Sequence, residues 1–77
     1  MNEIKKLHQE ASDTLWEIGV KRVLIKGKQE TVVNYKKLRV PTDYLEQQIV
    51  ELKAEKAELK IKLKDQLSKL LTLTEKL

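Results

Sequence analysis

Apolar residues recur in alternating steps of four and three along the C-terminal half of the chain, which is the heptad repeat of a coiled coil. Beyond Pro41 this half contains neither glycine nor proline, and either Thr42 or Asp43 can cap a helix there, Asp43 with Glu46 forming a capping-box pattern. We therefore predict one coiled-coil helix over residues 42–77. At about 1.5 Å per residue it would extend roughly 50 Å, too long to be buried inside so small a globule.

The apolar edge of this helix predicts self-association. Eight of its ten a and d positions are Ile or Leu, and the polar exceptions, Lys56 and Gln66, are of the kind that fix register or oligomer number. Packing against the rest of the same chain would cover only the first turns, so we expect a second chain to cover the remainder. A homodimer is expected, with a tetramer as the alternative, and the charges leave parallel and antiparallel arrangements open. The predicted oligomerisation residues are Leu45, Ile49, Leu52, Lys56, Leu59, Leu63, Gln66, Leu70, Leu73 and Leu77.

The first residues of the chain predict a short amphipathic helix. Asn2 can cap it, and its apolar positions step by three or four residues, which places them on one face. Gly19 can adopt the left-handed conformation that ends many helices, so we predict a helix over residues 3–18. Its apolar face would lie along a weaker second stripe of the long helix, which includes Val50, Ile61 and Leu71.

The middle of the chain predicts a β-hairpin over residues 21–36. Residues 21–26 and 31–35 are rich in β-branched side chains and alternate between apolar and polar, and a three-residue loop beginning at Gly27 would gather the apolar ones on one face. The predicted fold class is therefore α+β, mostly α. Residues 1–77 form a single domain that comprises a short helix, a hairpin and a long coiled-coil helix, and that is oligomeric.

The positive charge is concentrated in residues 19–40, where seven basic residues stand against Glu30 alone, whereas the chain as a whole has a net charge of +4. A basic hairpin in a coiled-coil dimer resembles, in its charge, the β-ribbons that enter a nucleic-acid groove. Only two of the seven are arginine and aromatic residues are scarce, so we would expect nonspecific contact with phosphates. The candidate nucleic-acid-binding residues are Lys21, Arg22, Lys26, Lys28, Lys36, Lys37 and Arg39.

No arrangement of residues that an enzyme site needs is evident in the sequence. The chain has no cysteine and a single histidine, His8, and its two glycines cannot form a phosphate-binding loop. We therefore expect no catalytic, metal or cofactor site. The longest apolar run, at Val23, is three residues long and predicts no membrane association. We expect a cytoplasmic protein, and the excess of lysine over arginine favours a bacterial or phage source.

These observations favour a small accessory protein that self-associates and binds a larger protein, which it inhibits or redirects. A DNA- or RNA-binding regulator that uses the basic hairpin is the alternative, and a structural scaffold is the third hypothesis. The exposed apolar residues left over from the seam are the candidate contacts for an unidentified protein partner. They are Trp16, Leu24, Val32, Val50, Ile61 and Leu71.

Overall fold

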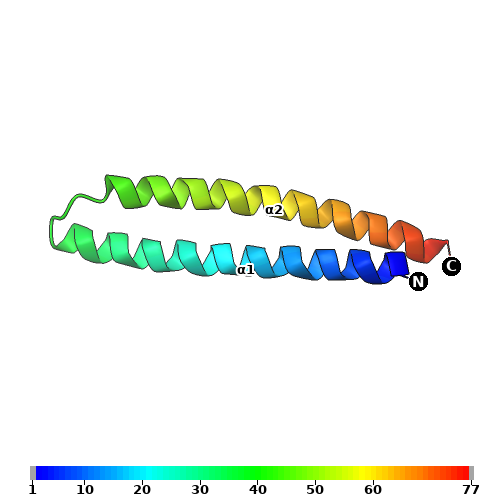
Figure 1. Cartoon of the computed structure of the whole chain (residues 1–77). Coiled ribbons are helices and arrows are strands. Elements are labelled where there is room, and N and C mark those ends of the chain that lie inside the picture. The colour runs from blue at the N-terminus through cyan, green and yellow to red at the C-terminus, as the bar shows by residue number, and fades with distance from the viewer. Residues whose placement is uncertain (1, 77) are drawn as a thin grey trace.

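The computed structural model describes residues 2–76, which form two long antiparallel helices packed side by side (Figure 1). Helix α1 spans Asn2–Lys37 and helix α2 spans Asp43–Glu75, with residues 38–42 connecting them. The molecule measures 60 × 14 × 13 Å. It is therefore a rod two helices wide, in which the start of α1 and the end of α2 lie at the same end (Figure 1).

The prediction of one uninterrupted helix in the C-terminal half is confirmed over Asp43–Glu75, and Leu77 lies outside the described residues. Thr42 is the N-cap residue, and its carbonyl oxygen accepts a hydrogen bond of 2.9 Å from the backbone N–H of Glu46. The Thr42 side chain makes no capping bond, and the Glu46 carboxylate instead pairs with Lys36 at 2.9 Å. The predicted capping box is therefore not formed.

The predicted α+β class and the β-hairpin over residues 21–36 are wrong. No strand forms within residues 2–76, and α1 passes without interruption through Gly19, where the short helix over residues 3–18 was predicted to end. Neither Gly19 nor Gly27 has a positive φ, so neither acts as a turn residue.

A second heptad repeat explains why the middle segment is helical. Apolar residues occupy every seventh position of α1 from Ile4 onward, and Ile25 and Val32 are buried against Ile49 of α2. Burying such a side chain contributes about 1.5–3 kcal/mol, whereas the helix propensities of Val, Ile and Thr differ from those of good helix formers by about 0.7 kcal/mol at most. Tertiary packing therefore outweighs the local strand preference. The heptad positions of α1 are Ile4, Leu7, Ala11, Thr14, Ile18, Lys21, Ile25, Lys28, Val32 and Tyr35.

Polar contacts across the helix pair fix its antiparallel register and distinguish its two broad faces. On one face the Lys21 Nζ lies 2.8 Å from a carboxylate oxygen of Glu55, and Lys28 donates a hydrogen bond of 2.9 Å to Gln48 on the same side. On the other face Lys36 pairs with Glu46. Glu55 and Gln48 occupy g positions of α2 and reach lysines at seam positions of α1, whereas Lys36 and Glu46 both occupy e positions on the opposite side.

The connection between the helices is held by a Schellman motif. The Val40 N–H donates to the Tyr35 carbonyl at 2.9 Å, and the Arg39 N–H donates to the Lys36 carbonyl at 3.1 Å. Arg39 occupies the left-handed position of this motif, with φ of 59°, where glycine is the usual residue. Pro41 follows directly and cannot continue the helix.

Replacing Gly19 or Gly27 by alanine should stabilise the hairpin by about 1 kcal/mol each, because glycine inside a helix costs about that much relative to alanine. A Cβ atom added at either position meets no atom within 4 Å, so nothing offsets the gain. Urea denaturation followed by circular dichroism measures the change. Ala54→Gly, at an exposed position inside α2, should shift stability by a similar amount in the opposite direction. A loss of stability in Gly27→Ala would contradict a helical α1.

Arg39→Gly should raise the free energy of unfolding by about 0.5–1 kcal/mol, because glycine adopts a positive φ without the steric cost that an L side chain incurs. Thermal unfolding of the two proteins under identical conditions measures the difference. Lys37→Gly serves as the control. Lys37 is the last residue of α1 and has a helical backbone, so glycine at this position should lower stability. A destabilising Arg39→Gly would show that the arginine side chain itself holds the connection.

Candidate functional site

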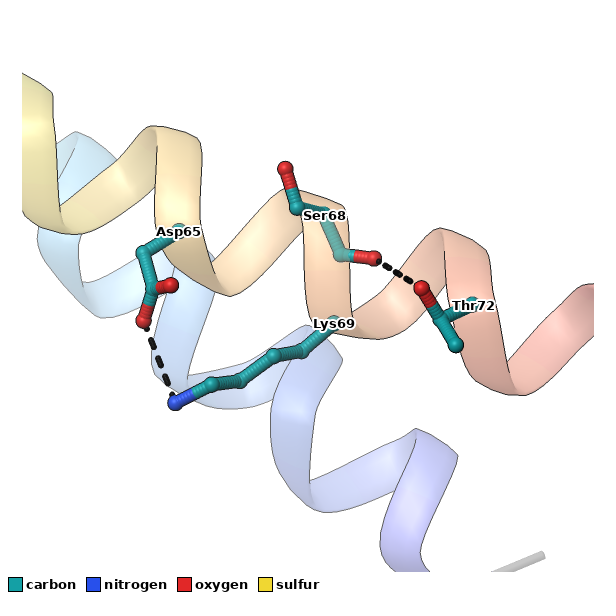
Figure 2. Close-up of polar contacts among 4 residues, drawn as sticks. All are labelled: Asp65, Ser68, Lys69 and Thr72. Atoms are coloured by element: carbon teal, nitrogen blue, oxygen red, sulfur yellow. Dashed lines mark hydrogen bonds and ion pairs between the residues drawn. The ribbon is translucent and has the colours of Figure 1, made fainter.

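The described residues do not bring together a metal-binding group of side chains. No three His, Asp or Glu side chains within residues 2–76 gather closely enough to hold a metal ion, and His8 is exposed on α1. The hydroxyls of Thr14, Thr31 and Thr72 donate to backbone carbonyls one turn earlier in their own helices, as Figure 2 shows for Thr72 and Ser68 at 2.9 Å. Within residues 2–76, neither helix is long and apolar enough to cross a membrane.

The leucine edge of α2, predicted to be covered by another chain, faces α1. Ile49 and Gln66 are buried, the seven further heptad positions up to Leu73 are half-buried, and Leu77 lies outside the described residues. Helix α1 thus occupies the place assigned to a second chain, along the far half of the edge as well as the near half. Self-association through these ten residues stays a prediction.

Two polar residues of α2, Gln66 and Lys56, interrupt the seam between the helices. Gln66 is buried at the level of Ala11, and its Oε1 atom has no hydrogen-bond partner among the described residues. In the same register Lys56 lies at the level of Lys21, whose amine is drawn aside to Glu55. Polar residues at these positions reduce stability and disfavour shifted registers, so they select this alignment of the hairpin.

The outer surface of α1 carries an open apolar depression of about 710 Å³. Trp16 and Val23 are 74% and 70% exposed at its centre, although aromatic and branched side chains of this size usually seek burial. An apolar hollow on the outside of a rod is typical of a protein-interaction site. The residues that line it are Ser12, Leu15, Trp16, Gly19, Val20, Val23 and Leu24.

The structure places the predicted partner contacts in three groups. Trp16 and Leu24 lie in this depression, whereas Val32 is buried with Ile25 and belongs to the core. The third group, on α2, is exposed and consists of Val50, Ile61 and Leu71.

Sequence reasoning missed Leu15, Gly19 and Val23 as surface residues, because it placed them at the end of a short helix and in a strand. A second run of steps of four and three could have identified Gly19 and Val23. It comprises Ser12, Trp16, Gly19 and Val23.

The seven predicted nucleic-acid-binding residues do not form one surface. Lys21, Lys28 and Lys36 each contact an acidic or amide side chain of α2, which reduces their availability to phosphates. Arg22 and Lys26 are exposed on α1, whereas the other two, Lys37 and Arg39, lie at the closed end of the hairpin. Because residues 21–36 are helical, the β-ribbon that would have presented these residues does not exist.

The exposed charges are distributed unequally between the two broad faces, although Lys62 lies beside Glu55 and Glu58 on the more acidic one. We define the basic face as the side of the rod on which Lys36 pairs with Glu46. Its exposed cations are Arg22 and Lys26 on α1 and Lys53, Lys60 and Lys64 on α2. We define the acidic face as the side of the Lys21–Glu55 pair. Its carboxylates are Glu10, Asp13, Glu17, Glu51, Glu55, Glu58 and Asp65.

One basic residue of the acidic face is neutralised locally. Lys69 pairs with Asp65 one turn earlier in α2, at 3.1 Å (Figure 2). By contrast, the five cations that define the basic face take part in no ion pair among the described residues. The positive charge of the basic face is therefore available to a partner.

Comparison of the chain with protein-family models, with curated proteins and with solved structures finds no match. The inferences that follow therefore rest on the residues of this chain.

Gln66→Leu should raise the free energy of unfolding by about 1 kcal/mol or more. The substitution removes a buried oxygen that lacks a hydrogen-bond partner and places an apolar side chain of similar size in the seam. Chemical denaturation measures the change. Gln47→Leu is the matched control, since Gln47 is exposed on the outer side of α2, and it should alter stability by less than about 0.5 kcal/mol. Equal stability of Gln66→Leu and the parent chain would mean that the buried oxygen is satisfied.

Proposed function

We propose that this protein is a non-catalytic helical hairpin that binds a larger protein and thereby inhibits or redirects it. The observation that carries the proposal is the apolar depression around Trp16 and Val23 on the outside of α1. Exposing such side chains has a cost in solubility, and burial against a partner would gain about 25 cal/mol for each Å² of apolar surface removed from water. The absence of cysteine from the chain favours a reducing cytoplasmic setting.

The position of Gly19 supports this proposal. A glycine in the middle of a helix costs about 1 kcal/mol relative to alanine, and the packing of α1 against α2 does not need one here, because a Cβ would meet no atom within 4 Å. Gly19 instead lines the depression beside Trp16. A glycine on a helix surface allows another backbone to approach closely, so a bound partner would account for a residue that folding alone disfavours.

Nucleic-acid binding is the second candidate function, and the unpaired cations of the basic face favour it. The apolar side chains among those cations do not suit phosphate contact, which depends on charge and falls steeply with salt. We therefore rank protein binding first, with the apolar depression as its site.

Val23→Glu should abolish capture of the partner from a bacterial lysate by the immobilised chain, because it places a charge in the centre of the depression. The substitution suits a helix and Val23 is exposed, so circular dichroism should show an intact hairpin. Tyr44→Glu is the matched control, since Tyr44 is 75% exposed at the start of α2, away from the depression, and it should leave capture unchanged.

The capture is quantified by mass spectrometry after nuclease treatment and a high-salt wash. A protein retained by the parent chain and by Tyr44→Glu but lost with Val23→Glu supports the proposal. Equal retention by all three, or release of all bound material by nuclease and salt, contradicts it.

A further inference from the structure

The buried cluster and the ion pairs that join α1 to α2 lie in the helices and not in the connection between them. The two cross-helix ion pairs are Lys21–Glu55 and Lys36–Glu46, and residues 38–42 form the loop at one end of the rod (Figure 1). An α2 helix supplied by a second copy of the chain can therefore make the same contacts with α1. The connection alone decides whether the two helices come from one chain or from two.

The connection is a strained part of the molecule. Arg39 has a φ of 59°, a conformation that is sterically costly for an L side chain and that glycine adopts freely. Pro41 follows two residues later and disfavours the α conformation at Val40. Short connections under strain favour domain swapping, in which two chains exchange the same element. Opening the connection would release the strain at Arg39 in each chain.

The connection also exposes large apolar side chains. Leu38 is 72% exposed, and Tyr35 and Val40 are each 42% exposed, so the hairpin leaves much of their surface in water. A second chain that crosses the first at this point would cover part of that surface. Burial of these side chains therefore favours the open form.

The register of the seam fits a straight dimer of two open chains. In the hairpin Lys21 lies at the level of Lys56, and the same register continued along an open chain sets Leu38 level with Arg39 of the second copy. Because these two residues are neighbours in sequence, the two chains cross at the connection on a two-fold axis. The exposed apolar side chains of the two connections then lie together.

We propose that two copies of the chain exchange their α2 helices, so that each α2 packs on the α1 helix of the other copy. This dimer keeps the seam and the ion pairs, and it covers the leucine edge of α2 with a second chain, as the heptad repeat predicts. It is a rod about twice as long as the hairpin. The inference goes beyond the proposed function, because the depression on the outside of α1 stays uncovered in the hairpin and in the dimer.

Protein concentration sets the balance between the two forms. The closed connection holds α1 and α2 of one chain at a high effective concentration, so the hairpin prevails in dilute solution. The fraction of dimer grows with concentration. Exchange requires the seam to separate, and unfolding of small domains is often slow, so samples are unfolded in urea and refolded at each concentration before measurement.

Two cysteine labels distinguish the forms, because the chain has no cysteine of its own. The substitutions Gln9→Cys and Ser68→Cys place spin labels at exposed positions. In the hairpin these positions lie near each other, since Ser68 lines a surface depression together with Leu7 of α1. In the exchanged dimer they are roughly 90 Å apart within one chain, at about 1.5 Å per residue, and the short distance joins different chains.

The labelled chain is refolded at high concentration with an excess of unlabelled chain, and pulsed dipolar spectroscopy measures the distances between labels. An exchanged dimer pairs most labelled chains with unlabelled ones, so the short distance should disappear as unlabelled chain is added. In a closed hairpin, or in a dimer of two closed hairpins, the short distance persists at every dilution. Light scattering of the same samples gives the number of chains.

Arg39→Gly should raise the dissociation constant of the dimer about tenfold, because it relieves the closed connection in both chains. Arg39→Ala is the matched control, since it removes the same charge but keeps an L side chain at the positive φ. It should change the dissociation constant by less than about threefold. Analytical ultracentrifugation of refolded samples measures both values.

Leu38→Lys should weaken the dimer about tenfold or more, because it replaces an apolar side chain at the two-fold axis by a cation beside Lys37 and Arg39 of both copies. Ile61→Lys is the matched control, since Ile61 is equally exposed, at 72%, and lies on α2 far from the connection. It should leave dimerisation unchanged. Circular dichroism verifies that both variants remain helical.

Three results overturn the inference. They are a monomer at every concentration after refolding, a dimer in which the short distance survives dilution, and equal dimerisation of Arg39→Gly and Arg39→Ala. The depression of α1 is accessible in both forms, so capture of a partner and its loss in Val23→Glu are measured independently of exchange. The two proposals therefore fail separately.

Discussion

The packing of α1 along the leucine edge of α2 is the interaction on which the whole structure depends. Neither helix has another surface within residues 2–76 to bury its apolar positions, and an isolated helix of this length gains little stability from hydrogen bonding alone. The seam aligns apolar residues at each seventh position of α1 with the leucines of α2 and so determines the register. The register in turn determines which outward side chains share a face, and the interaction surface is a consequence of it.

The C-terminal helix could be predicted because a single signal, the heptad repeat, runs through it without competition. The N-terminal helix carries the same repeat, with apolar residues at Ile4, Ala11, Ile18, Ile25 and Val32, but Thr14, Lys21 and Lys28 occupy the alternate positions. Short stretches of alternation and two glycines then favoured a strand. The strand prediction was wrong because an alternation over five or six residues was given more weight than a seven-residue repeat that runs the length of the helix.

The surface was partly predictable for the same reason. Trp16, Val50 and Ile61 stood out as apolar residues that the seam does not use, whereas Val32 was misassigned because its face depends on α1 being helical. The segregation of charge could not be read from the sequence until the antiparallel register was known. Arg22 and Lys60 are far apart along the chain, and only the hairpin sets them on one face.

A two-helix rod has an incomplete core, and this links binding to stability. No described side chain is fully buried, and most seam positions of α2 remain half-exposed, because two helices cannot enclose a residue on all sides. A partner that packs against the rod would cover part of this half-exposed surface. Any ligand that binds only the folded state stabilises it by mass action. A bound partner would therefore raise the stability of the hairpin as well as use its surface, and Gly19, which weakens the free chain, would contribute to the complex.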